Sequence, residues 1–173
     1  MRRRLLTIVV LACIVSAQAQ GTFQFTVNLN GANQVPPNNS TGMGNGTLTL
    51  TGQTLSYNFG GLWTFQVTTG SINGPSNPGF TAPVLFNLGA PSFAVPNPPD
   101  PGGYAFVGTI NNLNTAQIND LLAGLWYVNI YSTSFLEGEI RGQITPVPEP
   151  STLALLYLGA GLAVFRWRQT HRR

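Results

Sequence analysis

Apolar and polar residues alternate strictly in the segment that follows residue 20, a pattern typical of half-buried β-strands. Within residues 22–29 every second residue is Phe, Val or Leu, and the residues between them are Thr, Gln or Asn. The alternation returns in residues 47–51 and 54–59, where Gly52 and Gln53 predict a hairpin turn between two strands.

Apolar residues at every second position, separated by Gly-rich and Thr-rich turns, predict five further strands. These lie at residues 63–67, 84–88, 104–110, 126–130 and 140–144. Short antiparallel strands at this spacing predict an all-β fold, an antiparallel Greek-key β-sandwich or barrel of about eight strands.

Two stretches depart from the β pattern. Asn114 followed by Gln117 predicts an N-cap with a capping box, which opens a short crossover helix that ends before Gly124. Residues 89–103 contain five prolines, too many for the interior of a strand, and we expect an exposed extended loop there.

The C-terminal region combines a proline-rich stretch, an apolar run and a basic end. Residues 153–167 would form a helix of roughly 22 Å at about 1.5 Å per residue, a marginal transmembrane helix. We expect residues 168–173 to be a basic cytoplasmic tail, by the positive-inside rule, and residues 146–152 to be a stiff linker. A buried or amphipathic terminal helix of the domain is the alternative.

The order of these three parts resembles the PEP-CTERM sorting signal of exopolysaccharide-producing Gram-negative bacteria. The residues that carry the motif are Val147, Pro148, Glu149 and Pro150. The resemblance implies that an exosortase, a membrane protease, recognises the motif and releases the protein from its tail.

The N-terminal region has the features of a secretory signal peptide at residues 1–19. Three arginines precede an apolar run, and Ala17 and Ala19 form a cleavage site before Gln20. A lipoprotein signal with Cys13 as the lipidated residue is the weaker alternative. The pattern predicts export by the secretion machinery, with inner-membrane anchoring by the C-terminal helix and later delivery to the cell surface or the extracellular space.

Charge and composition exclude several classes of function. The chain has a formal charge of +3, but seven of its eight basic residues lie in the first four or the last eight residues. Within residues 20–145, Arg141 is opposed by four acidic residues, a net charge of minus three, so we expect no nucleic-acid partner. The same segment has neither His nor Cys, so we expect no metal and no cofactor.

Several short motifs resemble, in their order, the CHRD domain first named in chordin. The motifs are Leu29 to Pro37, Gly74-Pro75, Leu121 to Gly124, Tyr127 to Asn129 and Gly138 to Ile144. They span about residues 23–145, so we expect a CHRD-like β domain at residues 20–145. Members of this family commonly have histidines at three positions that could form a metal site, and here those positions are Ser71, Asn73 and Tyr131.

The acidic residues near residue 140 leave two interpretations open. Glu137 and Glu139 could act as the acid and base of a carbohydrate-active hydrolase. Alternatively, Glu139 and Arg141 lie two residues apart on one predicted strand and could form a structural ion pair. The second interpretation is favoured, and with it a protein that is not an enzyme.

Residues of one strand face give the candidate binding surface. Tyr127, Asn129 and Tyr131 alternate with apolar residues, and two phenols with an amide suit sugars or peptides. The alternative is that both faces of this strand are covered. We expect an exported, non-catalytic domain with a binding or structural role in the cell envelope or the exopolysaccharide matrix. Its partner would be a polysaccharide or a matrix protein. A purely structural matrix protein is the alternative.

Overall fold

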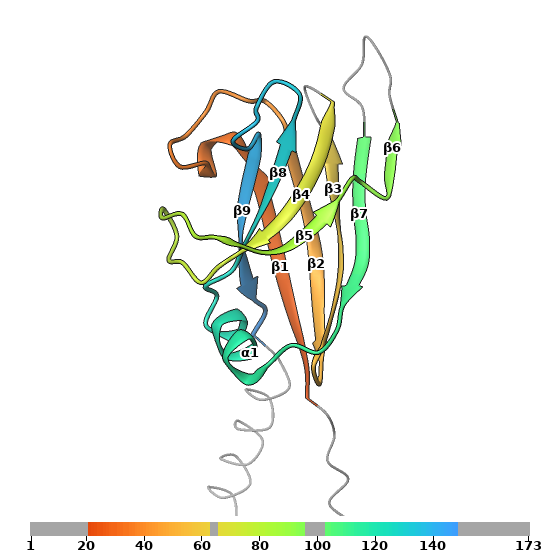
Figure 1. Ribbon diagram of the computed structural model, residues 1–173, viewed down its shortest axis with the longest axis vertical. Coiled ribbons are helices and arrows are strands. Elements are labelled where there is room, and N and C mark those ends of the chain that lie inside the picture. The colour runs from red at the N-terminus through yellow and green to blue at the C-terminus, as the bar shows by residue number, and fades with distance from the viewer. Residues whose placement is uncertain (1–20, 63–65, 96–102, 149–173) are drawn as a thin grey trace, which may run out of the picture.

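The computed structural model describes residues 21–62, 66–95 and 103–148, which form one antiparallel sheet of nine strands (Figure 1). The strands are β1 (Thr22–Asn30), β2 (Met43–Thr51), β3 (Thr54–Leu62), β4 (Val67–Asn73), β5 (Val84–Gly89), β6 (Phe93–Val95), β7 (Gly103–Ile110), β8 (Tyr127–Ser132) and β9 (Ile140–Pro146). Their order in the sheet is β5-β4-β8-β9-β1-β2-β3-β7-β6. The antiparallel all-β fold predicted from the sequence is confirmed.

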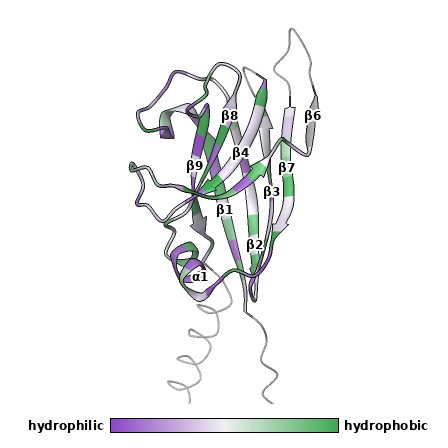
Figure 2. Cartoon of the chain, viewed as in Figure 1, coloured by the Kyte–Doolittle hydropathy of each residue, from purple (hydrophilic) through white to green (hydrophobic). Residues whose placement is uncertain are grey.

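The sheet curls into a nearly closed barrel with β5 and β6 as its edge strands. Hydrophobic and paler residues alternate along strands such as β2 and β7 (Figure 2). Side chains from all parts of the sheet fill the interior, and the largest fully buried ones include Phe25, Phe59, Phe106, Trp126 and Ile130. At Gly70 of β4 a Cβ atom would lie 3.0 Å from the Phe106 ring of β7, so a glycine lets the two sides of the barrel approach closely.

Local sequence signals predict several elements correctly. Gly52 has a positive φ of 60° in the tight turn that joins β2 and β3. Helix α1 (Thr115–Leu122) begins with both hydrogen bonds of a capping box, each 2.9 Å long, between Asn114 and Gln117. Gly124 follows with a φ of 71°, as expected for the residue after a helix C-cap.

Two sequence predictions are wrong in part. Residues 63–65 of the predicted fourth strand lie outside the described residues, and strand β4 begins at Val67 and runs to Asn73, beyond the predicted end. Its buried positions after Val67 include glycine as well as isoleucine, so no regular run of large apolar residues marks this part of the strand. The predicted loop at 89–103 contains strand β6 at Phe93–Val95, a stretch without proline between Pro91 and Pro96. An edge strand needs only one hydrogen-bonded neighbour, which here is β7.

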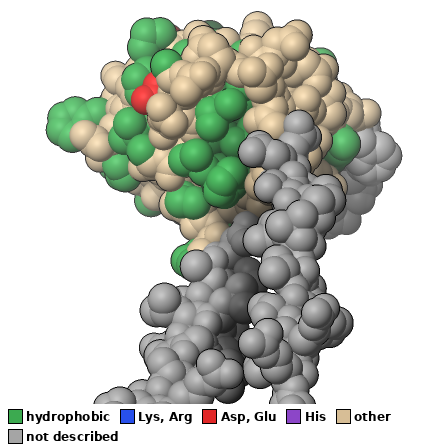
Figure 3. All heavy atoms as spheres, turned by 90° about the horizontal axis from the view of Figure 1, so that it is seen from below, with side chains coloured by type: hydrophobic (Ala, Val, Ile, Leu, Met, Phe, Trp, Pro, Cys, Tyr) green, Lys and Arg blue, Asp and Glu red, His purple; other side chains and the backbone are tan. Residues whose placement is uncertain are grey.

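The two ends of the β domain lie side by side. Near the start of β1, Phe25 pairs with Pro146 at the end of β9, and the Val147 N–H donates to the Gln24 carbonyl at 2.8 Å. Helix α1 lies at the same end of the barrel (Figure 1). Seen along the long axis from this end, the described surface consists mainly of hydrophobic and uncharged polar groups (Figure 3).

Several predicted segments lie outside the described residues. They are the signal peptide at 1–19 with its cleavage site, Glu149 and Pro150 of the sorting motif, the transmembrane helix at 153–167 and the basic tail. Within residues 21–62, 66–95 and 103–148, no helix is long and apolar enough to cross a bilayer.

Candidate functional site

Three positions singled out in the sequence meet on the outer side of β4 and β8. The Ser71 hydroxyl donates to Asn73 Oδ1 at 2.6 Å and lies 3.1 Å from the Tyr131 hydroxyl. These are the positions at which the CHRD resemblance places histidines. Here they form a neutral hydrogen-bonded cluster, and the described part of the chain contains no group of three or more His, Cys, Asp or Glu side chains that could hold a metal ion.

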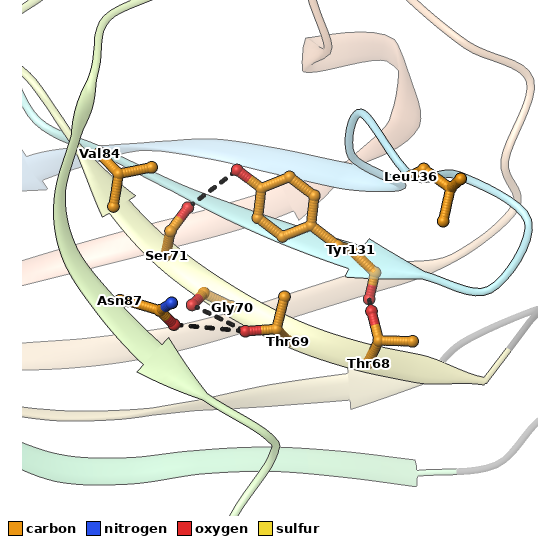
Figure 4. Close-up of a pocket in the computed structure, with 8 residues that line it drawn as sticks. All are labelled: Thr68, Thr69, Gly70, Ser71, Val84, Asn87, Tyr131 and Leu136. Atoms are coloured by element: carbon orange, nitrogen blue, oxygen red, sulfur yellow. Dashed lines mark hydrogen bonds between the residues drawn. The ribbon is translucent and has the colours of Figure 1, made fainter.

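A cleft of about 310 Å³ opens next to this cluster (Figure 4). Its lining residues come from β4, β5, β8 and the loop after β8: Thr68, Thr69, Gly70, Ser71, Val84, Asn87, Tyr131 and Leu136. The Thr69 hydroxyl donates to the Gly89 carbonyl at 2.9 Å, and Asn87 Oδ1 accepts the Gly89 N–H at 2.8 Å. The lining therefore offers hydroxyl groups, an amide and one aromatic ring, and none of its side chains is charged.

The three residues of the predicted binding face have different surroundings. Tyr127 is buried, and its hydroxyl contacts the Ala82 backbone, 3.0 Å from N and 3.1 Å from O. Asn129 is buried too, and its Oδ1 accepts from Gln34 Nε2 at 2.7 Å. Tyr131 is half-buried and lines the cleft. A binding role for this face stays a prediction, and Tyr131 is the member that a ligand in the cleft would contact.

Glu139 and Arg141 are both buried, with relative exposures of 1% and 3%, and their side chains have different neighbours. Glu139 Oε1 accepts from the Ser40 hydroxyl at 2.9 Å. Arg141 Nη2 donates to the Phe80 carbonyl at 2.6 Å. The predicted ion pair between them stays a prediction. Glu137 is exposed on the loop before β9.

Burial changes the acid–base properties of two groups near these residues. Burial, and to a lesser extent the charge of Glu139, raise the pKa of the Tyr104 phenol on β7. Burial also lowers the pKa of Arg141, although Tyr127 opposes that shift. The Arg141 guanidinium carbon lies 3.5 Å from the centre of the Tyr127 ring, a cation–π contact.

A second pocket, of about 380 Å³, lies over Arg141 and Gln143 of β9. Its other walls come from the loop that follows β1, which includes the 3₁₀ helix η1 (Gly31–Asn33), and from the loop between β4 and β5. Sequence reasoning missed this pocket, because its walls are more than 40 residues apart in the chain. The one local signal is Asn30, whose side chain accepts the Asn33 N–H at 2.9 Å and caps η1.

The beginning of the predicted sorting motif follows directly on the fold. Val147 continues the pairing beside β1, and Pro148 is exposed. Any recognition of Val147-Pro148-Glu149-Pro150 by a protease would therefore take place immediately after the last strand. Cleavage at Ala17, Ala19 and Gln20 stays a prediction, like the recognition of the motif.

Family models match two parts of the chain. The CHRD domain model matches residues 25–144, and the PEP-CTERM protein-sorting motif matches residues 146–173. The sorting motif indicates an exported protein that is anchored in the membrane before an exosortase processes it. No curated protein and no solved structure matches the chain. Because the first match covers more than half of the 173 residues, the chain belongs to the CHRD domain family.

Proposed function

We propose that this exported β domain is a non-catalytic binding module for uncharged polysaccharide, with the cleft around Tyr131 as its ligand site. The protein would be held at the inner membrane by its C-terminal helix and then delivered to the cell surface or the extracellular matrix. A purely structural role in that matrix is the alternative, and it would need no ligand site.

The observation that carries the proposal is the chemistry of the cleft. Tyr131 supplies a ring on which a sugar can stack, and hydroxyl groups and an amide surround it. Val84 and Leu136 add apolar walls. Aromatic and apolar surface with a few placed polar groups is the usual composition of a small-molecule site. Because no charged side chain lines the cleft, we favour a neutral ligand.

The surroundings of the two candidate acids support a non-catalytic role. A glycosidase of the common type needs two carboxyl groups on either side of the bond that is cleaved. Glu139 is 1% exposed, its carboxyl group contacts Ser40, and it lines neither of the two pockets described above, so its carboxyl group does not face a cavity that a substrate could enter. Glu137 alone cannot supply both functions.

The position of the cleft suits a protein tethered through its C-terminal end. Tyr131 lies near the end of β8, beside Ile130, which pairs with Ile140 at the start of β9. The chain leaves the fold at Pro146, six residues further along β9, a distance of about 20 Å at 3.3 Å per residue. The ligand site therefore lies about 20 Å from the point at which the chain leaves the fold, which would leave it accessible in a protein tethered through that end.

Binding of neutral polysaccharides by the full chain in detergent tests this proposal. We expect the wild type to be retained on at least one of dextran, cellulose, xylan and galactan, and Tyr131→Ala to weaken binding about tenfold, roughly 1.4 kcal/mol. Tyr57→Ala is the matched control, because Tyr57 also lies half-buried in a Thr-rich hollow, on β3. Equal losses in the two variants would contradict a site at Tyr131.

Two further outcomes would favour the other functions. Self-association of the full chain without any polysaccharide bound would favour the structural role. Release of reducing sugar from these polysaccharides, abolished by Glu139→Gln, would favour the hydrolase.

A further inference from the structure

Arg141 is the one basic residue of the 20–145 segment, and it lies at the base of the second pocket. Its side chain is 3% exposed, so the guanidinium is largely removed from water. Burying a charge is costly unless an opposite charge or hydrogen bonds offset the loss of hydration. A buried cation at the base of an open pocket is therefore a candidate ligand-binding group.

Within the described residues, the Arg141 guanidinium contacts a backbone carbonyl and an aromatic ring, which are both uncharged. Nη2 donates to the Phe80 carbonyl at 2.6 Å, and the carbon atom lies 3.5 Å above the Tyr127 ring. Both contacts fix the plane of the guanidinium, which has five N–H donors in all. The fixed plane is pre-organised for a bidentate interaction with a planar anion.

Three amide side chains surround Arg141 in the pocket, and each uses its nitrogen within the protein. Asn33 Nδ2 donates to the Arg141 carbonyl at 3.1 Å, and Gln34 Nε2 donates to Asn129 at 2.7 Å. Gln143 Nε2 donates to the Ser76 and Gly124 carbonyls, at 3.1 Å and 2.7 Å. The amide oxygens are the groups that can accept hydrogen bonds from ligand hydroxyls.

We propose that this pocket binds a carboxylate group carried by an otherwise uncharged saccharide, with the Arg141 guanidinium on the carboxylate and the amide oxygens on the sugar hydroxyls. The domain has a net charge of minus three over residues 20–145, which disfavours a polyanion. The single cation balances the charge of one carboxylate, whereas a doubly charged phosphate would keep an uncompensated negative charge in the pocket. The site is separate from the cleft at Tyr131 and shares none of its lining residues.

Titration of the full chain in detergent with four small probes tests this inference. The probes are methyl glucuronoside, methyl glucoside, acetate and inorganic phosphate. We expect methyl glucuronoside to bind at least about tenfold more tightly than each of the others, which corresponds to about 1.4 kcal/mol. Tyr131→Ala should leave this binding unchanged, so this test can succeed or fail independently of the proposed function.

Two pairs of variants locate the site. Arg141→Lys keeps the positive charge but removes the planar pair of N–H donors, and we expect the binding of methyl glucuronoside to weaken about tenfold. Because a buried substitution can disturb folding, the second pair lies at exposed Ala32 on the pocket wall. Ala32→Glu places a like charge near the ligand and should weaken binding about fivefold at low salt and less at high salt, whereas Ala32→Gln should change it less than about twofold.

Several results would overturn the proposal. One is equal binding of methyl glucoside and methyl glucuronoside, and another is preferential binding of phosphate or of acetate. The absence of saturable binding of any probe would also overturn it, as would equal effects of Ala32→Glu and Ala32→Gln.

Discussion

Strands β1 and β8 have the same alternating sequence pattern but different surroundings. In β1 the apolar residues from Phe25 to Leu29 point into the barrel, and the residues between them are exposed or half-buried. In β8 five of the six residues are buried, on both faces of the strand. The polar face of β8 lies beneath the loops that follow β1 and β4, as the contacts of Asn129 with Gln34 and of Tyr127 with Ala82 show.

The comparison teaches that alternation identifies which face of a strand packs in the core, but it does not show whether the other face is exposed to solvent or covered by loops. Where loops cover the polar face, as on β4, β8 and β9, side chains such as Asn129 and Arg141 become buried and the margins of the covered area form pockets. Replacing an outward-facing side chain should therefore lower the free energy of unfolding far more on the covered side than on the side formed by β1, β2 and β3.

The largest effect is expected at Gly138, between the covering loop and β8. Its φ is 126°, and a Cβ atom would lie 2.5 Å from Asn129 Oδ1 and 2.6 Å from Gln34 Nε2. Gly138→Ala should lower the free energy of unfolding by about 3 kcal/mol or more, measured by urea denaturation. Gly89→Ala is the control, because Gly89 also has a positive φ, of 70°, with nothing within 4 Å of the added atom, and it should cost about 1–2 kcal/mol. Equal losses of unfolding free energy in the two variants would mean that the loop after β1 moves to accommodate the added atom at little cost.

The buried amide pair sharpens the comparison directly. Asn129→Ala removes the acceptor of Gln34 Nε2 and leaves a buried donor without that partner, so we expect a loss of about 2 kcal/mol in unfolding free energy. On β1, Asn28 is an exposed asparagine, and Asn28→Ala should change stability by less than about 0.5 kcal/mol. Similar losses in the two variants would show that the loops do not exclude water from β8.

The pH dependence of stability tests burial on the opposite side of the barrel. The pKa of Tyr104 is raised above its ordinary value of about 10 by burial, so the unfolded chain releases this proton at lower pH than the folded chain. The contribution of the Tyr104 phenol to the free energy of unfolding is therefore fully present below about pH 10. It is lost as the pH rises further, by up to about 1.4 kcal/mol per pH unit. Tyr104→Phe should flatten the curve of denaturation midpoint against pH above 10. Parallel curves for the two proteins would contradict the burial of this phenol.

The helix cap should have the smallest effect, because it stabilises only one end of α1. Asn114→Ala removes the side-chain acceptor of the Gln117 N–H and should cost about 1 kcal/mol. Asn119→Ala at an exposed position of the same helix should be neutral or slightly stabilising, since alanine favours helix. Thermal unfolding followed by circular dichroism distinguishes the two, and a cost at Asn119 equal to that at Asn114 would argue against the capping box.

The sequence predicts best what depends on neighbouring residues. The turn at Gly52, the capping box at Asn114 and the alternation of β1 are local signals, and all three are confirmed. The sequence pattern misplaces the end of β4, because Gly70 occupies an inner position where the barrel walls approach each other. It misses β6, because an edge strand can be only three residues long.

The candidate sites depend on contacts between distant parts of the chain. The family resemblance pointed to Ser71, Asn73 and Tyr131, and they do meet, 60 residues apart in the case of Ser71 and Tyr131. No local pattern could show that Gln34 covers Asn129 or that Arg141 lies at the base of a pocket. Both follow from loops whose path is set by the closure of the sheet.

Hydrogen exchange of the full chain with and without the retained polysaccharide tests the proposed ligand site most directly. The account predicts slower exchange of backbone amides around Thr68 to Ser71, Asn87 and Tyr131, and no change in β2 and β3. Slower exchange confined to β2 and β3, around the hollow at Tyr57, would contradict it.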